Sequence, residues 1–104
     1  MNNLRRKELK HLADKMFEMN DIQDKSNLQK YYSRLENIKN DEEEYFNNMP
    51  ENLQGGQRGM DSESAIERME EAISLIEDAL AEDNDDELLD LIAEAVELIE
   101  EAAL

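Results

Sequence analysis

The fold is decided by residues 66–102, whose sequence is IERMEEAISLIEDALAEDNDDELLDLIAEAVELIEEA. Apolar residues recur there at intervals of three and four, once before and once after a short polar run. This spacing places them on one side of a helix that packs lengthwise against another helix. The apolar seam consists of Ile66, Met69, Ile73, Ile76 and Leu80 in the first repeat and of Leu88, Ile92, Ala95, Ile99 and Ala102 in the second.

The polar run at residues 83–87 is a short connection between the two helices. Asn84 and Glu87 have the spacing of a capping box, and Ser64 and Glu67 repeat that spacing near the start of the first helix. A connection this short forces the two helices to run antiparallel. We therefore expect an antiparallel hairpin of coiled-coil type, with helices over about residues 62–82 and 87–103.

The second helix of the hairpin has more apolar residues than one seam can bury, because it also carries Leu89, Leu91, Val96 and Leu98. Such a wide apolar face needs a second neighbour. That neighbour is either the N-terminal half of the same chain or a second copy of the chain. A homodimer is therefore one expectation from the sequence.

The N-terminal half also has helical spacing, in two registers. One covers Leu9, Leu12, Met16 and Met19, and the other covers Leu28, Tyr31 or Tyr32, Leu35, Ile38, Tyr45 or Phe46, and Met49. The register jumps across a polar stretch with a possible capping box, Ser26 and Gln29, so we expect a break near residues 20–27. The alternative is one continuous helix to Asn48.

Proline and glycine are confined to one place, where Pro50, Gly55, Gly56 and Gly59 interrupt the chain. Pro50 disfavours helical conformation in the residue before it, and glycines favour turns. The sequence therefore predicts an all-α helical bundle of four segments, each about 18–22 residues long and about 30 Å in length. Its parts are an N-terminal helical segment at residues 1–48, a linker at 49–60 and an acidic helical hairpin at 61–104.

The composition excludes several classes of function. The 104 residues include 28 acidic and 11 basic side chains, which give a net charge of −17, so nucleic acid and anionic membranes are unsuitable partners. There is no cysteine, which leaves no disulfide and no thiolate metal site. No apolar run approaches the roughly 18 residues of a membrane span. We expect an intracellular protein with basic partners.

The charge is unevenly distributed along the chain. Nine of the 11 basic residues lie in residues 1–40, whereas 22 of the 28 acidic residues lie in residues 41–104. Within the hairpin the acids recur at intervals of three and four, opposite the apolar seam. One stripe contains Glu63, Glu67, Glu70 and Glu77, with Ser74 between, and the other contains Glu87, Asp90, Glu94, Glu97 and Glu101.

These stripes are either solvated faces or a binding surface. Like charges at helical spacing cost about 0.2–0.5 kcal/mol per pair, yet Arg68 is the only basic residue in 59–104. Two adjacent acidic helices carry about one charge per 2.6 Å, compared with one phosphate per about 1.7 Å of duplex DNA. This density favours a protein that imitates nucleic acid, and the nine acidic residues of the stripes are its candidate contacts.

Other chemistry has little support in the sequence. Glu8 and His11 have the spacing of a di-iron ligand pair, but the chain has one histidine and such sites need two pairs. A calcium loop starting at Asp83 would need glycine where Leu88 stands. No nucleophile with a base and no phosphate loop is evident. We therefore expect a protein that is not an enzyme and that holds no metal or cofactor.

Residues 42–58, EEEYFNNMPENLQGGQR, and residues 65–73, AIERMEEAI, resemble small acidic helical proteins of phages and mobile elements of Gram-positive bacteria. The resemblance implies a setting of host takeover or anti-defence, in the cytoplasm of a bacterial host. In that setting, acidic anti-CRISPR proteins that imitate nucleic acid are a known solution, and the chain is similar to them in size and charge. Together with the acidic stripes, the resemblance leads us to expect a phage-type inhibitor of a basic nucleic-acid-binding defence protein, namely a CRISPR effector, that is, an anti-CRISPR protein acting as a DNA mimic. The alternative is a self-associating helical interaction module in which the acids only confer solubility.

Overall fold

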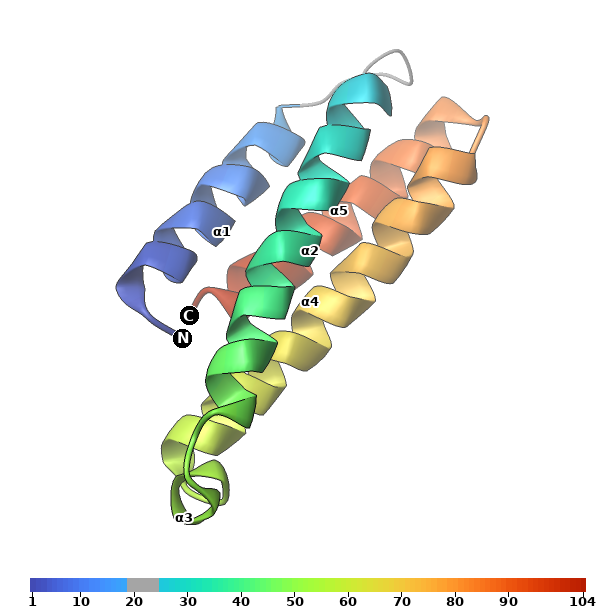
Figure 1. Cartoon of the computed structure of the whole chain (residues 1–104). Coiled ribbons are helices and arrows are strands. Elements are labelled where there is room, and N and C mark those ends of the chain that lie inside the picture. The colour runs from blue at the N-terminus through green and yellow to red at the C-terminus, as the bar shows by residue number, and fades with distance from the viewer. Residues whose placement is uncertain (19–24) are drawn as a thin grey trace.

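The computed structural model describes residues 1–18 and 25–104, and within these ranges it contains helices and no strand. Figure 1 shows how the helices are arranged. The helices are α1 (Asn3–Phe17), α2 (Lys25–Asn47), α3 (Glu51–Gln54), α4 (Gln57–Ala81) and α5 (Asp85–Ala102). The predicted all-α fold is confirmed. No helix in the described ranges combines the length and the apolarity that crossing a membrane would require.

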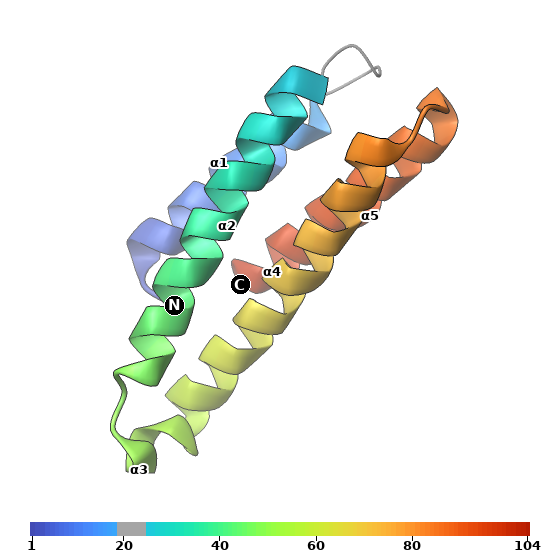
Figure 2. The same cartoon turned by 45° about the vertical axis from the view of Figure 1, so that its right-hand side comes forward.

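The four long helices form a ring of contacts. The α1–α2 pair lies on one side of the molecule and the antiparallel α4–α5 pair on the other, as Figure 2 shows. The pairs are joined where α2 packs against α4 and α1 packs against α5. Since α5 contacts both α4 and α1, its second neighbour is the N-terminal half of the same chain.

The helices are less equal in length than predicted. Helices α1 and α5 have 15 and 18 residues, whereas α2 and α4 have 23 and 25. One end of α2 and one end of α4 therefore extend beyond the four-helix section and are joined there by α3 (Figure 1). The molecule is elongated, with dimensions of 47 × 20 × 18 Å.

The two N-terminal helices are separate, as the predicted break requires. Helix α1 ends at Phe17 and α2 begins at Lys25, which excludes one continuous helix to Asn48. The centre of the predicted break, with Met19, lies outside the described residues. Ser26 lies within α2.

The linker predicted at residues 49–60 is shorter in the structure. Pro50 caps α3, and α4 begins at Gln57, about five residues earlier than expected. The close packing of α3 on α4 depends on Gly59, because a Cβ there would stand 1.9 Å from the carbonyl oxygen of Gln54. The first turn of α4 therefore forms within the glycine-containing stretch.

Of the predicted helix caps, Asn84 is correct and Ser64 is wrong. The Asn84 side chain accepts a hydrogen bond from the Glu87 backbone N–H at 3.1 Å and so caps α5. Ser64 caps nothing, because α4 starts seven residues before it and its N-cap, Gly56, provides no side chain. The early start of α4 thus leaves Ser64 inside the helix.

The core confirms the seam of α5 and corrects that of α4. All five predicted α5 residues are buried: Leu88, Ile92, Ala95, Ile99 and Ala102. On α4 the predicted Met69 and Ile76 are buried, but Ile66, Ile73 and Leu80 are only partly buried. The buried stripe of α4 consists instead of Ser62, Ala65, Met69, Ala72, Ile76 and Ala79. Since α4 packs on both α2 and α5, small side chains alternate with Met69 and Ile76 on its buried face, and Ile66, Ile73 and Leu80 lie at the edges of that face.

Candidate functional site

A groove on the outer surface between α4 and α5 gathers many of the acidic residues. Its floor contains three partly buried leucines, Leu75 of α4 and Leu91 and Leu98 of α5, which pack against the core. Its walls carry seven carboxylates: Glu71 and Asp78 from α4, Glu82 at the C-cap of α4, and Glu87, Asp90, Glu94 and Glu97 from α5. We call this surface the acidic groove. It consists of two adjoining hollows of about 450 and 520 Å³ that share Glu94.

The acidic groove contains only one of the two predicted stripes. The α5 stripe lines it from Glu87 to Glu97, but on α4 the groove acids are residues that the prediction did not include. Of the α4 stripe, Ser74 lines the groove, and the remaining members, Glu63, Glu67, Glu70 and Glu77, do not. The core stripe of α4 differs from the predicted one, so the side of α4 that faces the groove differs too.

Glu77 belongs to the other side of α4, where it contacts α2. The hydroxyl of Tyr32 donates a hydrogen bond to Glu77 Oε1 at 2.7 Å. This bond to a carboxylate, together with partial burial of the ring, raises the pKa of Tyr32 to about 12. Glu77 therefore has a structural partner within the bundle.

The positive charge available to the acidic residues of α4 and α5 is small. Arg68 pairs with Glu101 at 3.0 Å, and both side chains are about half exposed. Lys25 Nζ donates to the backbone carbonyl of Glu82 at 2.6 Å at one end of the groove. No lysine or arginine is among the described residues that line the acidic groove. The charge of Lys25 helps to lower the pKa of Glu82, and the other groove carboxylates repel one another with no basic residue among the described lining.

Two carboxylates at the α4–α5 turn have different protonation behaviour. Glu82 Oε1 accepts the backbone N–H groups of Asp83 and Asn84, each at 3.1 Å, and the bond from Asn84 contributes most to lowering the Glu82 pKa. A side-chain hydrogen bond with Glu82 and the negative charge of Glu82 raise the pKa of Glu87. Glu87 is thus the member of the pair that protonates first as the pH falls.

Sequence reasoning missed one buried carboxylate, Glu42 of α2. Its side chain is fully buried and accepts hydrogen bonds from Arg5 Nε at 2.8 Å and from the Ser62 hydroxyl at 2.5 Å. The ammonium group of Met1 lies 3.5 Å away. Glu42 thus connects α1, α2 and α4. Its signal was present in the sequence, because Glu42 continues the apolar register of α2 four residues after Ile38.

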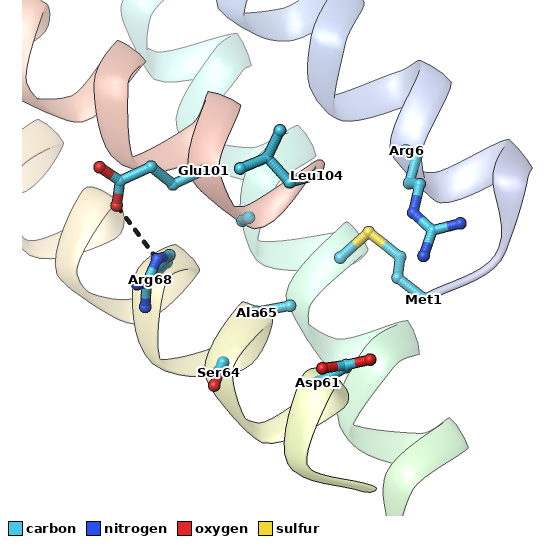
Figure 3. A pocket seen from close by; sticks show the side chains of 9 residues that line it. Met1, Arg6, Asp61, Ser64, Ala65, Arg68, Glu101 and Leu104 are labelled. Carbon is cyan, nitrogen blue, oxygen red and sulfur yellow. Dashed lines mark ion pairs between the residues drawn. The ribbon is translucent and has the colours of Figure 1, made fainter. Parts of the chain in front are cut away.

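A second hollow, of about 510 Å³, lies at the end of the four-helix section and is shown in Figure 3. Its rim includes Arg6 of α1, the Arg68–Glu101 ion pair and Leu104. Arg6 and Arg68 lie on opposite sides of the hollow in Figure 3, so their guanidinium groups do not converge on one point. This arrangement offers no concentrated charge to a ligand.

The outer face of α1 and α2 carries most of the basic residues. Lys7, His11 and Arg34 line a hollow between these helices, together with Glu8, and Lys10 and Lys30 are exposed nearby. His11 is exposed, and within residues 1–18 and 25–104 no three His, Cys, Asp or Glu side chains are placed to hold a metal ion. Helices α1 and α2 together carry nine basic and seven acidic residues, whereas α4 and α5 carry two basic and 15 acidic residues. The bundle therefore has a nearly neutral side and a strongly acidic side.

Comparison with protein-family models, curated proteins and solved structures gives no match. The case for a function therefore depends on the geometry and charge of the surfaces described above.

Proposed function

We propose that the protein binds a basic nucleic-acid-binding protein through the acidic groove and inhibits it by occupying the surface that nucleic acid would use. The observation that supports this proposal is the set of seven carboxylates with no basic residue among the described groove lining. A basic partner supplies the missing counter-charge. The same interaction releases the counter-ions of both surfaces, so the affinity falls steeply as salt increases.

Within this class of partners we propose a CRISPR effector, and we propose that the protein is a phage-type inhibitor acting in the cytoplasm of a bacterial host. The resemblance of residues 42–58 and 65–73 to proteins of phages and mobile elements supports this choice. The proposal assigns the protein no catalytic step, no metal and no cofactor. Inhibition follows from occupancy alone, because a protein and a nucleic acid cannot fill one basic surface together.

Competition with nucleic acid tests the proposal. A purified basic effector is mixed with its nucleic acid and with increasing amounts of the protein, and the bound nucleic acid is measured. We expect each to displace the other, with weaker displacement at higher salt. A ternary complex that contains all three components would contradict the proposal.

Two charge-reversal variants locate the contact. The triple variant Asp90→Lys, Glu94→Lys, Glu97→Lys alters the groove, and Glu63→Lys, Glu67→Lys, Glu70→Lys produces the same change of net charge outside it. We expect the first variant to lose inhibition and the second to retain most of it. Equal loss in both would assign the effect to net charge rather than to the groove. Full inhibition by the first variant would show that the groove is not the contact surface.

A second candidate function is self-association, because Phe17 is 76% exposed at the end of α1. It borders a hollow that is also lined by Ala93 and Val96 of α5, a small apolar patch surrounded by Glu94, Glu97 and Glu100. In this alternative a second copy covers the patch and the acids only confer solubility. Sedimentation of the wild type and of Phe17→Ser distinguishes the alternatives. A concentration-dependent dimer that disappears in the variant would support self-association.

A further inference from the structure

We propose that the acidic groove docks a basic amphipathic helix of the partner, with apolar side chains of that helix on the leucine floor. This inference depends on the proposed function only in requiring a basic partner. It adds that the partner contributes a projecting helix to this groove, in addition to any channel that it has for nucleic acid. Two features of the groove carry the inference: its floor and its helical walls.

The floor adds an apolar surface that a purely electrostatic contact would not use. An imitation of phosphates needs carboxylates exposed to water, whereas the parts of Leu75, Leu91 and Leu98 that stay exposed beyond their packing on the core are stabilised further when an apolar surface covers them. These leucines pack against the core, so their positions are fixed before a partner arrives. The groove is therefore preformed for an occupant that is apolar in its middle.

The spacing of the floor fits a helix. Leu91 and Leu98 are seven residues apart on α5, which corresponds to about 10.5 Å and two helical turns. Apolar residues at i, i+3 or i+4, and i+7 of an incoming helix repeat over the same distance. Lysine or arginine on both sides of that stripe would lie opposite Glu71 and Asp78 on one wall and Asp90, Glu94 and Glu97 on the other.

The walls offer no edge that an incoming β-strand could pair with. Both walls are helices, whose backbone N–H and C=O groups are already hydrogen-bonded within α4 and α5 away from their ends. An extended peptide would find no strand edge to pair with, and burial would leave its own backbone groups without partners. A helix satisfies its backbone hydrogen bonds internally, so it needs no backbone partner from the two helical walls.

A pair of synthetic peptides tests the inference with the full-length protein. The first is a labelled helix with leucines at i, i+4 and i+7 flanked by lysine and arginine. The second has the same composition, with the leucines distributed around the helix. Fluorescence anisotropy measures both affinities at low and high salt. We expect the patterned peptide to bind about tenfold or more tightly than the scrambled one, with a larger difference at high salt, where charge is screened.

Protein variants test the floor and the walls separately. Leu98→Ser alters the floor. Its control is Leu53→Ser, which replaces a half-exposed leucine of α3 in the same way. Because Leu98 also contacts the core, circular dichroism must show that its variant is folded. Glu94→Gln with Glu97→Gln alters one wall without changing the core, and Glu63→Gln with Glu67→Gln is its control of equal charge. We expect each groove variant to bind the patterned peptide more weakly than the wild type does. Each control should bind it as tightly as the wild type does.

The outcomes separate this inference from the proposed function. Equal affinity for the two peptides would contradict the inference that a helix docks in the groove. It would not contradict the proposal that the protein inhibits its partner through charge. Tight binding of the patterned peptide, together with failure to displace nucleic acid from any basic effector, would support the docked helix and count against the inhibitor. Chemical shift changes that avoid α4 and α5 would overturn the inference whatever the affinities.

Discussion

Glu42 shows how a single residue can specify the arrangement of three helices. A buried carboxylate is costly unless charged groups and hydrogen bonds compensate it, and here Arg5 of α1 and Ser62 of α4 do so. Only one arrangement of the helices brings both groups to Glu42. The network therefore selects a register between α1, α2 and α4 as well as contributing to stability.

Removal of this carboxylate should destabilise the bundle. In Glu42→Ala, Arg5 loses its counter-charge and Ser62 loses its acceptor. Since the Arg5 side chain is 15% exposed and can recruit water, we expect a loss at the lower end of the usual range, about 3 kcal/mol in the free energy of unfolding. Urea denaturation measures it. Glu44→Ala, at an exposed position of the same helix, is the control and should change stability by less than about 0.5 kcal/mol.

The Glu82–Glu87 pair gives a pH-dependent prediction. Because the folded-state pKa of Glu87 is raised above 4.5, its contribution to stability is complete below that value and decreases as the pH rises through the folded pKa. Glutamine imitates the protonated form. Glu87→Gln should therefore raise the Tm at neutral pH, and the difference should disappear well below pH 4.5.

Glu82, in the same turn, has a pKa shift of the opposite sign, so its effect on stability changes with pH in the opposite direction. Its pKa is lowered, chiefly by the N–H of Asn84, so its stabilising contribution is present above its ordinary pKa and is lost as the pH falls through the folded value. Thermal melts of the wild type and of Glu87→Gln across this range measure both effects. A Tm of Glu87→Gln at or below that of the wild type at pH 7 would contradict the assignment of Glu87.

At the scale of the helices, α4 depends on small residues. Ala65, Ala72 and Ala79 are buried at intervals of seven, where α4 packs against both α2 and α5. Ala72 is completely buried, so a larger side chain there must displace its neighbours. The small residues thus set how closely α4 can approach the other helices.

Enlarging one of these alanines should cost stability. We expect Ala72→Leu to lower the free energy of unfolding by about 1–3 kcal/mol through overpacking. Ala93→Leu, at an exposed position of α5, should stay within about 0.5 kcal/mol of the wild type. Chemical denaturation compares the two. An unchanged free energy of unfolding in Ala72→Leu would mean that the packing around α4 is looser than the burial of Ala72 indicates.

The helices themselves were predictable because apolar spacing and turn residues act locally, as at Leu88, Ile92 and Asn84. The buried face of α4 was not predictable, because small and large apolar residues fit the same spacing. Only the contacts of α4 with its two neighbouring helices decide whether Ala72 or Ile73 is buried. The same uncertainty misplaced the α4 side of the groove. Burial of Glu42 depends on Arg5, which is distant in sequence, so local patterns alone do not establish it.

At the scale of the whole molecule, a net charge of −17 opposes folding through repulsion. We expect the Tm to rise as sodium chloride increases from about 0.01 M to about 1 M, because the screening length falls from about 30 Å to about 3 Å. Scanning calorimetry of the protein without a partner measures this. A Tm that falls with salt would show instead that exposed ion pairs such as Arg68–Glu101, which salt screens, outweigh the repulsion.

The separation of a nearly neutral α1–α2 side from a strongly acidic α4–α5 side gives the molecule a dipole moment across its long axis. In the field of a positively charged partner this dipole produces a torque, which turns the α4–α5 side forward before the surfaces touch. A larger fraction of diffusional encounters is then productive. Association should therefore be fast at low salt, and inverting the dipole without changing the net charge should slow it.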